Sequence, residues 1–599
     1  MKRNRYPLFS VLLAFILFHS ACAQNSGVAY LKEEKKVEQS TVLLNNGDYL
    51  VPLRNIGNLK IASIHFSNIY AAGFDSLLNK YAKVQLFNGS NNPDAKKINS
   101  LSADLKLFNT LIIQTTEADL NNPQVIKLIT DNQHIKNVVV AYFGKSNAKL
   151  NEVTAPIIYS ENSSSVSAFF SAQAIFGGVA ITQKLTGNIS SRYRNGMGFL
   201  TEKIRLQYTV PEAVGINAAN LQDIDKIARE AMQAHATPGC VVLVAKDGKV
   251  IFNKAYGYHT YGSDQSDKIT DIFDIASMTK ISATTIEAMQ LKDQGKLNVD
   301  STIGHYLPVT RLTNKNDLRV RELLTHSAGL IADIPGFEKV RPADHSADSS
   351  AAYPTKVNNG YFLRKDYFKD VMWPTMLNSP LKNRGQYLYS DLSMCFMQQI
   401  LETITGTPEN TYVQQQFYNP LGMQTAGFLP LYRFSPTQIV PSEDEQEFRH
   451  SLLDGYVNDP TAALMGGVAG HAGVFASAND VAILYQMLLN RGTYGGDQYI
   501  RPETVDLFTA KQSDMSRRGL GFDRWDPITT HHYPSELASP DSYGHTGYTG
   551  TCVWVDPKYN LVYVFLSNRT YPKVSSKLSS LNIRPRIQDV VYKAIQKGL

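Results

Sequence analysis

Short apolar runs alternate with polar, helix-length segments through the first third of the chain. The runs lie at residues 60–66, 84–87, 111–113 and 138–142, and a helical stretch at 74–78 follows the first of them. Apolar runs of this length between helices are typical of βαβ units around a buried parallel sheet. We therefore predict an N-terminal α/β domain over residues 24–200.

The pattern changes beyond residue 200. After a connection at 190–215, a helical stretch extends to about Ala234, and two apolar runs within 241–252 flank the dipeptide Asp247-Gly248. An Asp-Gly pair between two such runs is a strong signal for a β-hairpin. Residues 201–599 are predicted to form a second, mixed α+β domain.

Composition and charge narrow the classes of function. The 599 residues contain 59 Lys and Arg and 53 Asp and Glu, a formal charge of +6, and three of the positive charges lie in the first five residues. That surplus is too small for a nucleic-acid-binding surface. With 43% hydrophobic and 19% charged residues the chain can bury a large core, and four cysteines are too few for a disulfide scaffold.

The first 23 residues have the pattern of an export signal. Three basic residues precede an apolar stretch at 8–18, and Ala21-Cys22-Ala23 gives the small-x-small pattern of a cleavage site before Gln24. We expect an exported, periplasmic protein. The alternative is a lipid anchor on Cys22, although His19 stands where a lipobox has an aliphatic residue.

The remaining cysteines and histidines do not suggest a metal centre. Cys240, Cys395 and Cys552 are widely spaced and are expected to be small buried hydrophobes, and the adjacent pair at 531–532 has no partner at metal-ligand spacing. No metal or cofactor is predicted.

The central chemical signal is Ser277-Met278-Thr279-Lys280, which opens a helix-compatible run. Residues three apart on a helix share a face, so the Lys280 ammonium is expected near the Ser277 hydroxyl. A hydroxyl is a weak nucleophile and needs a neighbouring base or cation to lose its proton. Taken alone this spacing also fits a helix N-cap with a surface lysine.

Two later motifs favour a catalytic serine over a plain helix N-cap. Tyr389-Ser390-Asp391 and His545-Thr546-Gly547 follow in the order of Tyr-x-Asn and Lys-Thr-Gly, so the three motifs together resemble those of the serine β-lactamase and penicillin-binding protein superfamily. Residues 323–330 and 467–475 resemble further segments of it. The resemblance spans about 210–599 and is closest to class C β-lactamases and their D,D-peptidase and esterase relatives. It implies an antiparallel sheet flanked by helices, plus a helical subdomain.

The resemblance assigns roles to the motif residues. Ser277 would attack a carbonyl and form an acyl-enzyme, while Lys280 and Tyr389 would share the proton transfer. The backbone N–H groups of Ser277 and Tyr548 would form the oxyanion hole. Substrate would lie along the strand that carries the third motif, against His545, Thr546 and Gly547, with Asp391 facing it from the second.

Two departures from the family pattern bear on the substrate. Asp391 replaces an Asn that donates an amide hydrogen bond, and an ionised Asp only accepts. His545 replaces a Lys, which makes the positive charge near a substrate carboxylate dependent on pH. Both changes argue against an efficient β-lactamase and suit a peptidase with weaker anion recognition, or an esterase.

The first block carries a second resemblance. Residues 42–46 and 51–53 are similar to the opening, and 172–178 and 184–187 to the close, of the C-terminal α/β domain of family 3 glycoside hydrolases. In that family the nucleophilic Asp lies on a separate preceding barrel, for which the segment before Val42 is too short. We expect a packing or docking module here, and no glycosidase.

Several other residues allow both a structural and a functional interpretation. His326 is expected to be a structural hydrogen-bonding residue rather than a base, and His471 fits a scaffold or a substrate loop equally. The adjacent His531 and His532 are expected in a solvent-facing loop. The aromatic-rich stretch 337–373 is expected to cover the mouth of the site, and plain packing explains it nearly as well.

These observations predict an exported serine hydrolase of acyl-enzyme type. The favoured substrate is a peptidoglycan peptide or related small molecule, cleaved by a D-alanyl carboxypeptidase or amidase with possible cell-wall association. One alternative is an esterase or weak β-lactamase of the same fold. Another is a non-catalytic cell-wall-binding protein. No nucleic-acid partner is expected, and the sequence does not indicate an oligomeric state.

Overall fold

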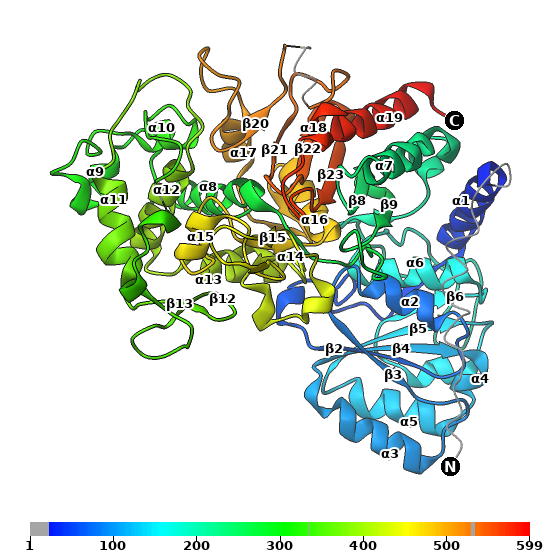
Figure 1. Cartoon of the computed structure of the whole chain (residues 1–599). Helices are drawn as coiled ribbons and strands as arrows, with labels where there is room; N and C mark the ends of the chain where they lie inside the picture. Colours follow the sequence, from blue (N-terminus) through cyan, green and yellow to red (C-terminus); the bar gives the residue numbers. More distant parts are fainter. Residues whose placement is uncertain (1–22, 335, 529–533) are drawn as a thin grey trace.

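The structure is a computed structural model that describes residues 23–334, 336–528 and 534–599 (Figure 1). The predicted export signal lies outside the described residues except for Ala23, which begins helix α1 (Ala23–Ser40). Within the described ranges, no helix is both long enough and apolar enough to cross a membrane.

The N-terminal part is built on a six-stranded sheet in the order β1-β6-β5-β4-β2-β3. Strands β2 to β6 run parallel, and β1 pairs antiparallel with β6 at one edge. The strands are β1 (Val42–Leu44), β2 (Ile61–His65), β3 (Val84–Asn88), β4 (Thr110–Thr116), β5 (Asn137–Phe143) and β6 (Ile157–Ser160). The predicted parallel α/β sheet is confirmed, and the apolar runs at 60–66, 84–87, 111–113 and 138–142 all form strands.

Helices cover both faces of this sheet, so it is buried on both sides. Helices α2 (Ala71–Leu78) and α6 (Ser165–Phe176) share one core with the sheet, and α1 packs on α6. Helices α3 (Ala95–Asp104) and α5 (Pro123–Asn132) share the core on the opposite face. This three-layer arrangement explains why the strands read as continuous apolar runs rather than alternating ones.

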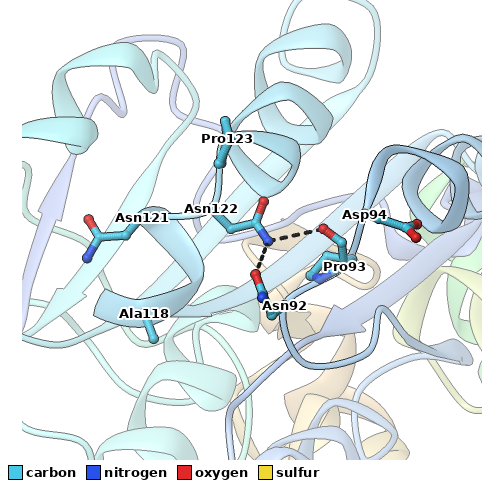
Figure 2. Close-up of a pocket in the computed structure, with 7 residues that line it drawn as sticks. All are labelled: Asn92, Pro93, Asp94, Ala118, Asn121, Asn122 and Pro123. Atoms are coloured by element: carbon cyan, nitrogen blue, oxygen red, sulfur yellow. Dashed lines mark hydrogen bonds between the residues drawn. The ribbon is translucent and has the colours of Figure 1, made fainter.

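An open depression of about 480 Å³ lies where β3 and β4 end and lead into α3, the short α4 (Glu117–Leu120) and α5. Figure 2 shows the Asn122 amide donating to Asn92 Oδ1 (2.8 Å) and to the Pro93 carbonyl (3.1 Å), which ties the two loops together. The residues that line the depression are Asn92, Pro93, Asp94, Ala118, Asn121, Asn122 and Pro123. The depression therefore belongs to the N-terminal part and contains no residue of the three motifs.

The second part is built on a seven-stranded sheet in the order β20-β21-β22-β23-β8-β9-β7. It is antiparallel except for the β7–β9 pair. The strands are β20 (Asp523–Arg524), β21 (Tyr543–Thr546), β22 (Cys552–Asp556), β23 (Leu561–Ser567), β8 (Gly239–Lys246), β9 (Lys249–Gly257) and β7 (Gln207–Tyr208). The predicted hairpin is β8–β9, and its turn residues Asp247 and Gly248 both have positive φ, at 52° and 68°.

Two helical layers sandwich this sheet. Helices α7 (Asp223–Gln233) and α19 (Ile583–Lys597) pack on one face, while α8 (Thr285–Asp293) and α16 (Ala478–Leu489) pack on the other. Figure 1 shows α7 and α19 side by side beyond the sheet. The second layer continues into the helical region that completes the site.

The second part contains further short elements outside the seven-stranded sheet. The helices are α9 (Ile303–Tyr306), α10 (Val320–Leu324), α11 (Trp373–Leu377), α12 (Asp391–Thr405), α13 (Glu409–Val413), α14 (Asn419–Leu421), α15 (Pro460–Leu464), α17 (Pro502–Thr509) and α18 (Lys577–Ser580). The small strands are β10 (Phe273–Asp274), β11 (His345–Ser346), β12 (Thr355–Asn358), β13 (Tyr361–Leu363), β14 (Gly427–Phe428), β15 (Asp444–Glu445), β16 (Ser451–Leu452), β17 (Val474–Ala476), β18 (Thr493–Tyr494) and β19 (Asp497–Gln498). Helices α9, α10 and α13 pack on α12 and form the helical subdomain implied by the resemblance, whereas α17 packs on α8 and α18 on α19.

The two parts are packed tightly against each other around residues 205–208. Arg205 is buried and donates through Nη1 to the carbonyls of Leu53 (2.8 Å) and Phe176 (2.7 Å) in the N-terminal part. Tyr81 stacks on Phe176 with ring centroids 5.2 Å apart, and its hydroxyl donates to the Leu206 carbonyl. The buried Arg205 side chain and the Tyr81 hydroxyl therefore hold the two parts together by hydrogen bonds to backbone carbonyls.

Candidate active site

Ser277 lies at the end of a strained turn. Strand β10 pairs with β17, and Ile275 donates its N–H to the Val474 carbonyl at 3.1 Å. Ala276 then takes a left-handed conformation (φ 47°), and its N–H is held by Asp274 Oδ1 at 2.8 Å. A non-glycine residue in this region costs of order 1 kcal/mol or more. The turn presents the partly exposed Ser277 at the start of the helical run.

Lys280 is fully buried beneath Ser277, and its ammonium makes several polar contacts. Its Nζ donates to Ser277 Oγ at 2.8 Å and to the His471 carbonyl at 3.0 Å. It also forms an ion pair with Asp391 Oδ1 at 2.6 Å. The predicted approach of the ammonium to the hydroxyl is present, since the chain winds from a 3₁₀ turn (Ala276–Met278) into a π turn (Lys280–Thr284) before α8.

The Lys280 ammonium is held in its charged form. Burial alone would lower the pKa of Lys280, but the Asp391 carboxylate and the Tyr389 phenol outweigh burial and raise it above the ordinary value. The residue that family motifs present as a hydrogen-bonding Asn is therefore used here as a counter-ion. In this resting state Lys280 is a cation and a hydrogen-bond donor.

Tyr389 is surrounded by cationic and imidazole groups. Its ring centroid lies 5.1 Å from Lys280 Nζ and 5.5 Å from the Arg518 guanidinium carbon. The His326 ring lies against it at 4.6 Å between centroids, and the His545 ring lies 6.1 Å away. The second motif thus meets both the first and the third at Tyr389.

Backbone hydrogen bonds fix the second motif against the segment 326–332. Ser390 donates its N–H to His326 Nδ1 (3.2 Å) and its hydroxyl to the Ile331 carbonyl (2.7 Å). Asp391 donates its N–H to the Ala332 carbonyl (2.8 Å), and Asp391 is the first residue of α12. Because His326 Nδ1 accepts, the imidazole acts as the predicted structural hydrogen-bonding group, and burial lowers its pKa well below the ordinary value.

The third motif lies on β21 and the turn that follows it. Thr549 Oγ1 donates to the Asp274 carbonyl (2.7 Å) and Thr551 Oγ1 to the Ile275 carbonyl (3.2 Å), which holds this turn against the nucleophile segment. A Cβ on Gly547 would lie 2.5 Å from the Ile275 carbonyl oxygen, so only glycine fits there. Thr546 is partly exposed on β21, and the side chain of Tyr548 is exposed.

The structure corrects the expectation of a pH-dependent positive charge at residue 545. His545 is buried, and its Nδ1 lies 2.7 Å from the Thr546 carbonyl. Burial, followed by the charges of Arg518 and Lys280, lowers the pKa of His545 to about 3. The imidazole is therefore neutral across the physiological range and offers no fixed cation to a substrate carboxylate.

The sequence left two roles open for His471, scaffold or substrate loop, and the structure favours the scaffold. It is buried, with Nε2 at 2.9 Å from Asp459 Oδ1 and Nδ1 at 3.3 Å from Cys395 Sγ. Its carbonyl accepts from Lys280. Burial alone would lower the pKa of His471, but Cys395 and the Asp459 carboxylate outweigh burial and hold it well above its ordinary value. His471 thereby fixes the loop that positions Lys280.

Arg518 is the site residue that sequence reasoning missed. It is 5% exposed, its guanidinium lies over the rings of Tyr387 and Tyr389, and it lies 3.6 Å from Asp523 Oδ1. Arg518 is 131 residues from Tyr387 in a polar segment with no motif of its own. Only the folded sheet edge at β20 brings it to the second motif.

Other expectations have mixed outcomes. Cys240, Cys395 and Cys552 are buried free thiols, as predicted. In the stretch 337–373, Phe337 stacks on Phe448 and Trp373 packs on Phe396, so packing is present and its covering of the mouth stays a prediction. The predicted loop at 531–532 lies outside the described residues.

The chain is similar to several known proteins. A protein of Escherichia coli O157:H7 named "Putative D-alanyl-D-alanine carboxypeptidase" is 32% identical over 400 residues, which cover 62% of this chain and 88% of the relative. A Bacillus subtilis protein named "N-acetylmuramyl-L-alanine amidase" is 30% identical, over 62% of this chain and 86% of the relative. A solved structure titled "EstCE1, a hydrolase with promiscuous acyltransferase activity" covers 62% of this chain at 19% identity and a TM-score of 0.47. The family model described as Beta-lactamase matches residues 224–584, and the chain belongs to that family of serine hydrolases.

Proposed function

We propose that the chain is an exported hydrolase that cleaves peptidoglycan peptides through an acyl-enzyme on Ser277, as a D-alanyl carboxypeptidase or a related amidase. The observation that carries the proposal is the Lys280 ammonium, which donates to Ser277 Oγ while Asp391 holds it in place. The names of the relatives from Escherichia coli and Bacillus subtilis support the substrate class.

The chemistry proposed for the first step follows from the contacts of Lys280. Because Lys280 is charged, it stabilises negative charge as it forms on Ser277 Oγ rather than removing the proton itself. We assign the Tyr389 phenol, whose ring faces the same ammonium, to relay that proton: its oxygen takes the Ser277 proton as its own O–H proton passes to the amide nitrogen of the leaving group. The protonated nitrogen then leaves as an amine when the C–N bond breaks, and the acyl group stays on Ser277.

The oxyanion of the tetrahedral intermediate is proposed to bind between the N–H groups of Ser277 and Tyr548. The two hydrogen bonds from Thr549 and Thr551 to the carbonyls of Asp274 and Ile275 support this, because they hold the two N–H-bearing segments at a fixed separation. Removing one preorganised donor of this kind costs acyl transfer about 3 to 4 kcal/mol.

The test is intact mass after incubation with a labelled penicillin or with a fluorophosphonate, followed by digestion of muropeptides. We expect one adduct per chain in the wild type, none in Ser277→Ala, and release of D-alanine from the muropeptides. Ser282→Ala is the matched control, because Ser282 lies on the same helical run with its hydroxyl 2.9 Å from that of Tyr485. An adduct that persists in Ser277→Ala contradicts the assignment of the nucleophile.

A second candidate, an esterase of the same fold, is favoured by the state of His545. The buried neutral imidazole provides no cation for the carboxylate that ends a D-alanyl peptide. An adduct with the fluorophosphonate but not with penicillin, together with turnover of a short p-nitrophenyl ester and no D-alanine, would select this function. No adduct with either reagent would favour the non-catalytic cell-wall-binding protein.

We also propose that the N-terminal α/β part is a docking or packing module of the kind suggested by its resemblance to family 3 glycoside hydrolases. Its support is the buried contact of Arg205 and Tyr81 across the boundary, which fixes it to the hydrolase part. Export, with a periplasmic location or a lipid anchor at Cys22, is part of the same proposal.

A further inference from the structure

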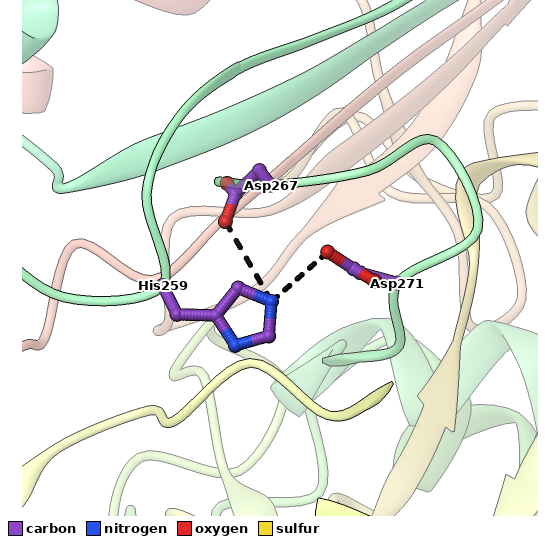
Figure 3. A group of neighbouring side chains, drawn as sticks. All are labelled: His259, Asp267 and Asp271. Atoms are coloured by element: carbon purple, nitrogen blue, oxygen red, sulfur yellow. Dashed lines mark hydrogen bonds and ion pairs between the residues drawn. The ribbon is translucent and has the colours of Figure 1, made fainter. Parts of the chain in front are cut away.

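Three buried metal-ligating side chains converge in the segment between β9 and β10, away from the three motifs. His259, Asp267 and Asp271 each offer one ligand atom, and these atoms all lie within 4.8 Å of one another. Figure 3 shows both carboxylates directed at the same imidazole nitrogen, Nε2. Asp271 Oδ2 lies 2.9 Å and Asp267 Oδ1 4.0 Å from that nitrogen.

Asp267 is the feature that a simple ion pair does not explain. Its side chain is fully buried, and in the part of the chain that the structure describes neither of its carboxylate oxygens has a hydrogen-bond partner. A buried polar group without a partner is costly, and native structures normally give it a hydrogen-bond partner, a water molecule or an ion. The group His259–Asp271 already forms a close pair, so Asp267 is an additional, uncompensated acceptor aimed into the cluster.

Charge balance is consistent with a cation at this position. A divalent cation bound by neutral His259 and the two carboxylates gives a buried cluster with no net charge.

We propose that His259, Asp267 and Asp271 bind a divalent transition-metal cation, with Zn²⁺ as the cation that fits best. One imidazole nitrogen with carboxylate oxygens suits zinc, and bonds of about 2.0 to 2.2 Å place tetrahedral ligand atoms about 3.4 Å apart. The observed separations of 2.9 and 4.0 Å from His259 Nε2 bracket that spacing, and all three ligand atoms lie within 4.8 Å of one another, so modest side-chain adjustments would form the site.

The contacts around the cluster indicate a structural role for the cation. Asn568 donates through Nδ2 to the His259 carbonyl (2.8 Å) and to the Pro441 carbonyl (2.9 Å). Gln265 donates to the Thr437 carbonyl, and Ile272 continues the same segment as a bridge to Ile439. The cation would clamp the segment that leads into β10 and the nucleophile turn, without touching substrate.

The test uses the full chain, stripped of metal with a chelator and titrated with Zn²⁺ by calorimetry, with metal content measured after gel filtration. We expect one Zn²⁺ per chain and a rise in Tm, since a ligand at 100 times its Kd favours the folded state by a factor of about 100. Asp267→Asn is expected to weaken binding at least tenfold, as is His259→Gln. His235→Gln is the control, because His235 is an exposed neighbour that stacks on Tyr261 and lies outside the cluster.

One further measurement keeps the proposal falsifiable if a variant is unstable. In the metal-free state Asp267→Asn removes an unpartnered buried carboxyl, so its Tm is expected to equal or exceed that of the metal-free wild type. Equal zinc binding by the wild type and by both cluster variants would overturn the proposal, and so would the absence of bound zinc in the wild type. These results do not depend on whether Ser277 is acylated.

Discussion

The ion pair between Lys280 and Asp391 makes a quantitative prediction about stability. The charged atoms are 2.6 Å apart, with Lys280 fully buried and the Asp391 side chain 23% exposed. At an effective dielectric constant of 20, Coulomb attraction at this distance is about 6 kcal/mol. Desolvation of Lys280 opposes it, and removing one partner of a buried pair typically costs about 3 to 5 kcal/mol. We expect a coupling free energy of about 3 kcal/mol between the two side chains.

A double-mutant cycle with Asp391→Asn, Lys280→Met and the double variant measures this coupling free energy at pH 7. Because the raised pKa keeps Lys280 protonated there, the stabilisation is fully present, and it is lost only as pH rises through that pKa. Urea unfolding can be followed by tryptophan fluorescence, since all three tryptophans lie beyond residue 200 and report on the hydrolase part.

A matched control is available in the same part of the chain. Lys226 Nζ and Asp223 Oδ1 lie at the similar distance of 2.7 Å, but their side chains are 75% and 61% exposed, so their coupling free energy is expected to be about 0.5 kcal/mol or less. A coupling below about 1 kcal/mol for Lys280 and Asp391 would equal that of an exposed pair. It would refute the conclusion that Asp391 serves as the counter-ion of Lys280.

Three further predictions follow from the site and the boundary. Because the pKa of His545 is lowered to about 3, protonation of the unfolded chain lowers the free energy of unfolding of the wild type by about 1.4 kcal/mol per pH unit below 6.5. In urea unfolding, the free energy of unfolding of His545→Gln should therefore fall by about 2 kcal/mol less than that of the wild type between pH 7 and pH 5. Gly547→Ala should slow acylation at least 100-fold in a stopped-flow assay because its Cβ would meet the Ile275 carbonyl oxygen, while Gly187→Ala, with open space, should not. Arg205→Met should lower the free energy of unfolding by about 2 to 4 kcal/mol because two buried carbonyls of the N-terminal part lose their donor, and an unchanged unfolding curve would contradict this.

Local signals predicted much of this fold. The four apolar runs of the first block became strands because a parallel sheet covered on both faces needs continuous apolar stretches. Asp247-Gly248 predicted the β8–β9 hairpin because its two positive φ angles are those of the turn that joins such strands. Strand β1 was not assigned antiparallel to β6, since its direction is set by a pairing between residues 42–44 and 157–159 that no local pattern records.

The sequence motifs named residues that the structure brings together, but they did not predict the charge states of these residues. Ser277 and Lys280 are close because they are one helical turn apart, which the sequence states directly. The charge state of His545 depends on burial and on Arg518, and the role of Asp391 depends on the direction in which its carboxylate turns. Both are properties of groups brought together from distant segments, so a motif could name the residues without giving their chemistry.

These charge states bear on the choice between peptide and ester substrates. The two cations at Tyr389 already face carboxylates, Lys280 at 2.6 Å from Asp391 and Arg518 at 3.6 Å from Asp523, and His545 is neutral. A substrate carboxylate must compete with these partners, whereas a neutral acyl donor need not. If D-alanyl peptides bind through Arg518, their kcat/KM should fall several-fold between 50 and about 500 mM salt, because the Debye length shortens from roughly 14 to 4 Å, while p-nitrophenyl ester turnover stays constant. Parallel salt dependence for both substrates would show that no fixed cation selects the substrate.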